Sequence, residues 1–120
     1  MKVLAVFVLV AACLAGCASG TRLRDSRATA MYRGSGSVQD IATCVNAAWS
    51  QKPVHLESYV LYTGTTIEIH LTEQSPAIAL VDIKPVSDKT VASYYSAFTD
   101  DDSWYFEQVD RCVSTTPATN

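Results

Sequence analysis

The spacing of apolar residues changes at Pro53, and this change limits the folds open to the chain. Before Pro53, apolar residues recur every three to four positions, as on the buried face of a helix. They are Val38, Ile41, Ala42, Val45, Ala48 and Trp49. Ser37 and Asp40 resemble a capping box at the start of this segment. We therefore predict an amphipathic helix over about residues 38–51, which Pro53 prevents from continuing.

After Pro53, apolar and polar residues alternate, which is typical of β-strands. Strands are expected over residues 54–62 and 67–72, on either side of a turn around Gly64. Residues 77–83 form a more continuous apolar run, as in a strand covered on both faces. Residues 90–98 supply a fourth strand, in which aromatic and small residues alternate.

A second helix is expected over residues 104–113. Three acidic residues precede it, where negative charge favours the helix dipole: Asp100, Asp101 and Asp102. Tyr105, Val109 and Cys112 share one face of this helix. The predicted fold class is α+β, with an N-terminal helix, a four-stranded antiparallel meander and a C-terminal helix, both helices lying on one face of the sheet. This single domain spans residues 37–114, and a disordered tail follows over residues 115–120.

The N-terminus has the parts of an export signal: Lys2, an apolar run from Val3 to Leu14, and small residues after it. The run is too short to span a membrane, which takes about 20 apolar residues. The tetrapeptide 14–17, Leu-Ala-Gly-Cys, resembles the lipobox of bacterial lipoprotein precursors. The resemblance implies a signal peptide over residues 1–16, cleavage before Cys17, and attachment of acyl chains to Cys17.

Lipidation would make Cys17 the first residue of a membrane-anchored protein, because two or three acyl chains suffice to hold it on a membrane surface. In Gram-negative lipoproteins, an aspartate after the cysteine favours the inner membrane, so Ala18 favours the outer membrane, on its periplasmic face. The alternative is an ordinary secretory signal cut near residues 18–20, which would leave a soluble periplasmic protein.

The cysteines leave one pair for the folded domain. Cys13 leaves with the signal peptide and Cys17 takes the lipid, so Cys44 and Cys112 remain. In an oxidising compartment a disulfide between them is the expected outcome. Two buried free thiols are the alternative.

Charge divides the mature chain into two parts. Residues 17–33 carry four arginines and one aspartate, a net of plus three, whereas residues 34–120 carry four basic and eleven acidic side chains, a net of minus seven. Residues 17–36 are also rich in Gly, Ser and Thr, so they are interpreted as a flexible basic linker. The acidic domain and its compartment argue against binding to nucleic acid.

A wider resemblance covers most of the mature domain. Its elements are the spacing from Cys44 to Trp49, an apolar strand ending at Asp82, the tyrosine-bearing strand after it, and the late helix that ends in Asp110 and Cys112. Together they resemble a group of small proteobacterial lipoproteins that have no assigned activity. The resemblance implies a lipid anchor and the same arrangement of elements, and it implies no reaction.

The sequence offers little catalytic or metal-binding chemistry. His55 and His70 are the only histidines. His70 and Glu68 share the polar side of one strand, but a usable metal site needs three or four ligands, so these residues are interpreted as exposed strand positions. No Gly-x-Ser-x-Gly elbow is present, and the Asp100–Asp102 run lacks the later residues of an EF-hand. We predict no catalytic residue, no metal and no cofactor.

Consecutive aromatic residues at 104–106 cannot all lie on one helix face. The outward ones, together with the tyrosines of the last strand, are candidates for an interaction patch made of Tyr94, Tyr95, Trp104 and Tyr105. The alternative is that these rings form a satellite cluster of the core.

Two functions are consistent with these features. The first is a non-catalytic cell-envelope lipoprotein that serves as an interaction or structural module and contacts another envelope protein. The second is a small-ligand-binding or hydrolytic protein that uses the open face of the sheet. A pocket with convergent polar groups and a perturbed histidine would favour the second, whereas a flat aromatic patch would favour the first.

Overall fold

A computed structural model describes residues 19–118 of the chain, with side-chain burial assigned from residue 22 onward. In chain order its elements are α2 (Ser19–Asp25), β1 (Ala30–Gly34), α3 (Val38–Trp49), β2 (His55–Leu61), β3 (Gly64–His70), β4 (Ala77–Val86), β5 (Lys89–Ser96) and α4 (Ser103–Thr115). None of the helices in this range is long and apolar enough to cross a membrane. The predicted signal peptide and Cys17 lie outside the described residues.

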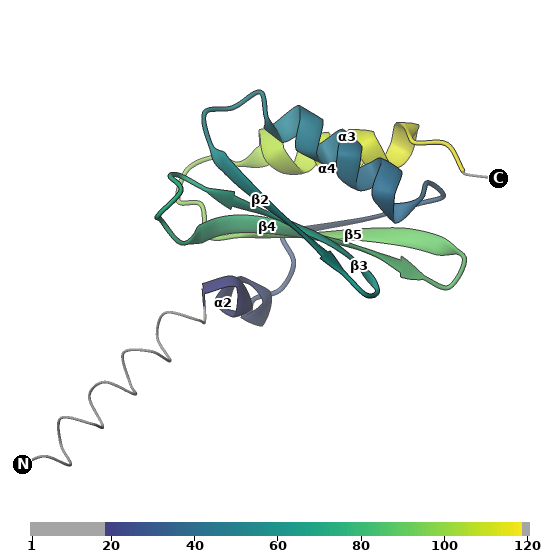
Figure 1. Ribbon diagram of the computed structural model, residues 1–120, viewed down its shortest axis with the longest axis horizontal. Coiled ribbons are helices and arrows are strands. Elements are labelled where there is room, and N and C mark those ends of the chain that lie inside the picture. The colour runs from purple at the N-terminus through teal and green to yellow at the C-terminus, as the bar shows by residue number, and fades with distance from the viewer. Residues whose placement is uncertain (1–18, 119–120) are drawn as a thin grey trace, which may run out of the picture.

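The strands form one antiparallel sheet in the order β1-β5-β4-β3-β2 (Figure 1). The α+β class is confirmed, and β2 to β5 form a meander. The prediction of four strands was wrong, because β1 adds a fifth beside β5, with Ala30 opposite Tyr94 and Gly34 opposite Thr90. Its residues lie in the segment interpreted as a flexible linker. That segment has too few apolar residues to show a period, and only pairing with β5 makes it a strand.

Both α3 and α4 lie on one face of the sheet (Figure 1). The Ser37 hydroxyl accepts a hydrogen bond from the Asp40 amide at 3.1 Å and so caps α3, as the sequence indicated. Ile41, Val45 and Trp49 of α3 are completely buried, together with Val109 of α4. The helical spacing of the sequence therefore corresponds to the face that packs on the sheet.

A disulfide joins Cys44 of α3 to Cys112 of α4, with the two Cα atoms 5.7 Å apart. The predicted pairing is confirmed. Trp49 adds a second link between the two helices, because its indole N–H donates a hydrogen bond to the Tyr105 carbonyl at 2.9 Å. The two helices therefore form one layer, in which the disulfide links residues that are 68 positions apart in the sequence.

The other face of the sheet carries α2, which also lies within the predicted linker (Figure 1). Leu23 packs with Ala77, Leu80 and Tyr95 in a small separate core. Only one apolar side chain of α2 is in this core, so the sequence pattern does not reveal it. The part of this face formed by β2 and the end of β3 is left without a helix over it (Figure 1).

Candidate functional site

The four aromatic residues proposed as an interaction patch do not share a surface. Tyr94 is completely buried in the helix-side core, where burial raises the pKa of its hydroxyl, which donates a hydrogen bond to Asp102. Tyr95 lies on the opposite face beside Leu23, because successive strand residues point to opposite sides. Trp104 and Tyr105 are partly buried against the main core. The rings therefore contribute to two cores on opposite faces of the sheet.

A groove opens on the helix side of the sheet, between α3 and the hairpin made by β2 and β3. We call it the α3–hairpin groove; its volume is about 790 Å³. Its walls include Ala42, Thr43 and Ala47 of α3, Val60 of β2, Tyr62 of the hairpin turn and Ile67 of β3. Among residues 19–118, no charged side chain lines it. A volume of this size matches the usual range of ligand pockets.

The hairpin tip beside this groove exposes several apolar side chains. Val60 is 87 % exposed, Tyr62 is fully exposed, and Leu61 is more than half exposed. Val60 has the same parity as Leu56, which packs on the helix-side core, so the sequence predicts it to be buried. Val60 stays exposed because the α3–hairpin groove separates this end of the hairpin from α3. The sequence pattern therefore predicts the β2 strand correctly but does not show that its end presents an exposed apolar surface.

The β2 strand is an edge of the sheet, since β3 is the only strand in the described part of the chain that pairs with it. Leu61 and Gly64 close the two-residue turn as a hydrogen-bonded pair. By the alternation of an antiparallel ladder, the main-chain groups of Leu56, Ser58 and Val60 then point outward. β2 has neither the lysine nor the proline that commonly protects an edge strand.

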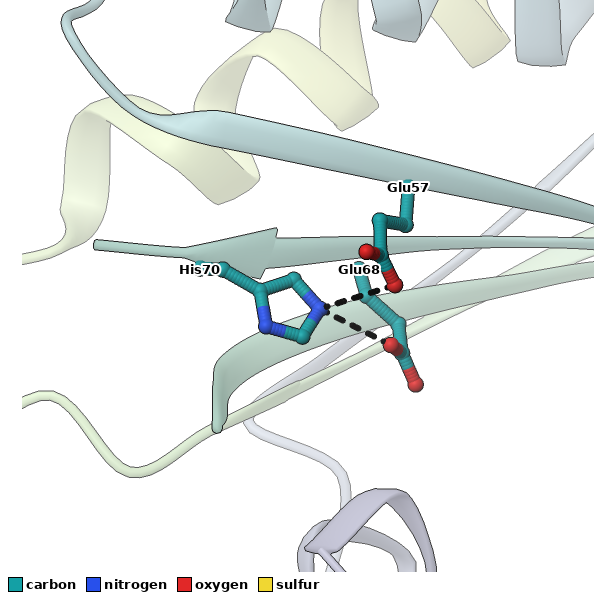
Figure 2. Close-up of side chains that lie close together, drawn as sticks. All are labelled: Glu57, Glu68 and His70. Carbon is teal, nitrogen blue, oxygen red and sulfur yellow. Dashed lines mark hydrogen bonds and ion pairs between the residues drawn. The ribbon is translucent and has the colours of Figure 1, made fainter. Parts of the chain in front are cut away.

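On the opposite, open face of the sheet, two histidines and two glutamates lie together. The hairpin register places His55 opposite His70 and Glu57 opposite Glu68, so all four side chains point to one side. Figure 2 shows His70 directed at both glutamates. Its Nε2 lies 3.0 Å from Glu68 Oε1 and 3.5 Å from Glu57 Oε2, and His55 Nε2 lies 3.3 Å from Glu57 Oε1. We call these four residues the His–Glu cluster.

The four side chains of the His–Glu cluster differ in their exposure to solvent. The side chains of His70 and Glu68 are 9 % and 14 % exposed, whereas those of His55 and Glu57 are each 36 % exposed. The Tyr59 hydroxyl donates a hydrogen bond to Glu57 Oε2, which lowers the pKa of Glu57 and raises that of Tyr59 to about 12. Burial alone would lower the pKa of His70, but the Ser75 carbonyl and the two glutamates together raise it.

Sequence reasoning named His70 and Glu68 as a possible start of a metal site but interpreted them as exposed strand positions. That interpretation was wrong, because their side chains are largely buried, and it missed that Glu57 supplies a third ligand atom. The atoms that Glu57, Glu68 and His70 offer lie within 4.8 Å of one another. The signal was present, because counting outward from the hairpin turn brings Glu57 and His55 opposite Glu68 and His70. Reading the two strands separately hid this relationship.

Comparisons with known proteins return no relative. No protein-family model matches the chain. No curated protein matches it, and no solved structure does so. The function must therefore be argued from the chain's own geometry.

Proposed function

We propose that this protein is a cell-envelope lipoprotein that acts as a non-catalytic interaction module. Its location is argued from the sequence: the export signal and the lipobox-like tetrapeptide ending at Cys17 support an acyl anchor in the outer membrane, on the periplasmic face. The β1 strand begins at Ala30. The chain from Cys17 to that strand would connect the anchor to the domain.

The partner we propose is an extended apolar segment of another envelope protein, which adds to the sheet along β2. The observation that supports this most directly is the uncharged α3–hairpin groove beside an unprotected edge strand. In β-strand addition, main-chain hydrogen bonds supply affinity and pockets for alternate side chains supply specificity. β2 offers the outward main-chain groups of Leu56, Ser58 and Val60, and the groove offers the pocket.

Side-chain alternation determines what such a segment would contact. Every second residue of the added strand would point to the helix side, between Val60 and the groove wall formed by Ala47. The intervening residues would point to the open face, beside Leu61 and Tyr59. Because the groove lining is uncharged, the segment should place apolar residues on the helix side.

Site-specific photocrosslinking in the native bacterium tests this proposal. A photoreactive residue at Val60 should capture one recurrent envelope protein through an extended apolar segment. The same residue at Met31, exposed on the far edge strand, should not capture it. Ser58→Pro removes an outward amide, and Ala47→Trp fills the groove from an exposed position, so each should abolish the Val60 crosslink. A crosslink that persists in both folded variants, or that forms equally at Met31, would refute the proposed surface.

The anchor has a separate test. Cys17→Ser should stop lipid attachment and move the protein out of the membrane fraction. Metabolic labelling with a radioactive or clickable fatty acid should mark the unaltered chain and not the variant. Continued membrane association of Cys17→Ser with normal processing would contradict the lipoprotein assignment without affecting the proposal about β2.

A second candidate function, small-ligand binding, is favoured by the convergence of polar side chains in the His–Glu cluster on the open face and by the raised pKa of His70. These are the features that the sequence led us to expect of that function. This arrangement is suited to binding a small positively charged ligand. No reaction is proposed for it.

A further inference from the structure

We propose that Glu57, Glu68 and His70 bind a divalent transition-metal ion, with His55 as a fourth ligand. Zinc is the ion that best fits these donors, since imidazole nitrogens and carboxylate oxygens are its usual ligands besides thiolates. The site lies on the open face of the sheet, on the opposite side from the α3–hairpin groove. It faces away from that groove, although both sites use residues of β2.

The hydrogen bonding of His70 carries the argument. Its Nδ1 lies 2.7 Å from the Ser75 carbonyl oxygen, which can only accept, so Nδ1 carries the hydrogen. In the neutral ring, Nε2 then presents a lone pair toward two carboxylate oxygens at 3.0 and 3.5 Å. Three such electron-rich atoms repel one another unless a positive charge lies among them. A proton on Nε2 can be directed fully at only one of these oxygens, whereas a metal ion can bind all three atoms.

The spacing of these atoms fits a metal ion. Zinc bonds of about 2.0 to 2.2 Å place the ligand atoms of a tetrahedral site roughly 3.3 to 3.6 Å apart. The distances from His70 Nε2 to the two glutamates, 3.0 and 3.5 Å, lie close to this range. The 3.3 Å between His55 Nε2 and Glu57 Oε1 lies within it. Three of the donors, from Glu57, Glu68 and His70, already lie within 4.8 Å of one another, and the partly exposed His55 ring must rotate to join them.

The surroundings of the cluster resemble the outer shell of a metal site. A metal-binding histidine usually donates its other ring N–H to a carbonyl or carboxylate, which fixes its orientation, and Ser75 provides this contact for His70. Tyr59 similarly holds Glu57 through its hydroxyl. The two cross-strand pairs of one antiparallel hairpin set the backbone positions. The partly exposed His55 and Glu57 leave a route by which an ion can enter.

The guanidinium of Arg24 makes no hydrogen bond to the His–Glu cluster. It instead donates hydrogen bonds to Asp82 and Thr66. Arg24 interacts with Glu68 only through longer-range electrostatics, and in the described part of the chain the ion pairs of the two glutamates within 4.0 Å are to the cluster's own histidines. The charge balance of the cluster is therefore left to a proton or a bound cation.

Calorimetric titration of the full chain with zinc chloride, after removal of metals by a chelator, tests the inference. We expect one zinc ion per chain. Glu57→Gln, a change at a partly exposed side chain, should weaken binding by at least tenfold, and His70→Gln should weaken it at least as much. Tyr59→Phe should weaken it by about tenfold, because Tyr59 positions a ligand without being one. Glu73→Gln removes an exposed carboxylate from the β3–β4 turn and should leave the affinity unchanged.

Several results would overturn the proposal: no binding by the folded chain, or equal affinity in Glu57→Gln and Glu73→Gln. Since His70 is nearly buried, circular dichroism of each variant must show the native fold, and Glu57→Gln decides the matter if His70→Gln does not fold. Cobalt absorption provides a second readout of nitrogen and oxygen ligation. Ala47→Trp, on the helix side of the sheet, should not change zinc affinity, so failure of the metal site and failure of the partner surface are distinguishable.

Discussion

Arg24 and Asp82 form a two-pronged ion pair that ties α2 to the sheet. The Arg24 Nε donates to Asp82 Oδ2 at 2.7 Å, and its Nη2 donates to Oδ1 at 2.8 Å. Thr66 of the neighbouring strand donates to the same carboxylate at 2.6 Å. A residue from the predicted linker thus completes the hydrogen bonding of a partly buried acid in the central strand β4.

Removing the charge of Asp82 should loosen α2. Asp82→Asn keeps the size of the side chain but replaces two charge-assisted bonds, so we expect a loss of about 1 to 2 kcal/mol in the free energy of unfolding. The loss stays small because Arg24 is partly exposed and solvent screens the pair. Denaturant unfolding measures it, and Asp88→Asn, at an exposed turn, is the matched control. Equal stability of the two variants would contradict the prediction.

The same carboxylate should make stability depend on pH. Burial would raise the pKa of Asp82, but Arg24 and Thr66 outweigh burial and lower it below its ordinary value of 3.8. A lowered pKa in the folded state means that the stabilisation is complete above the unfolded pKa and is lost as pH falls through the folded one. The stability difference between the unaltered chain and Asp82→Asn should therefore shrink below about pH 4. A difference that stays constant down to pH 2.5 would exclude this cause.

The disulfide should contribute strongly to the free energy of unfolding of the domain. Cys44 and Cys112 are separated by 68 positions, and closing a loop of that size stabilises a protein by about 4 kcal/mol in the chain-entropy model. The double variant Cys44→Ser, Cys112→Ser should lose up to this amount in denaturant unfolding. Reductant should lower the stability of the unaltered chain and leave that of the double variant unchanged. If reductant affects both equally, the disulfide is not the cause.

Gly34, the last residue of β1, should not tolerate a side chain. A Cβ there would lie 2.7 Å from Val113 Cγ1 and 2.8 Å from the Val113 carbonyl oxygen, which belongs to the backbone of α4 and cannot rotate away. We expect Gly34→Ala to lower the free energy of unfolding by about 1 to 3 kcal/mol. Ser35→Ala, at the next and exposed position, should change it by much less. Thermal unfolding of both variants makes the comparison.

Much of the helix layer and of the sheet could be predicted because the apolar residues of each element recur at the spacing typical of a helix or a strand. Trp49, Ile41 and Val45 recur at helical spacing, and α3 begins and ends within two residues of the prediction. The disulfide followed from the expectation that Cys13 leaves with a signal peptide and that Cys17 takes a lipid. By contrast, β1 and α2 have too few apolar residues to produce a period, and they form through contacts with Tyr94 and Leu80 that lie far away in sequence.

In the candidate sites, too, only residues that are close in sequence could be related to one another before the structure was known. His70 and Glu68 could be found because they lie two residues apart on one strand, whereas Glu57 joins them only through the hairpin register. The alternating pattern also predicted a buried face for β2, but it could not show that a groove separates the end of this strand from α3 and leaves Val60 exposed. Exposure depends on how closely a covering element packs, and no local pattern contains that information.

The sequence by itself determined the fold class, the helices α3 and α4, the strands β2 to β5 and the pairing of Cys44 with Cys112. Local periodicity and capping are enough for such elements, because the residues that define them are near neighbours in the chain. Only the tertiary structure decided that β1 adds an edge strand and that α2 covers part of the open face, and that the His–Glu cluster and the α3–hairpin groove exist. These depend on residues that are distant in sequence and come together when the strands pair, so their positions are set by the packing of the whole domain.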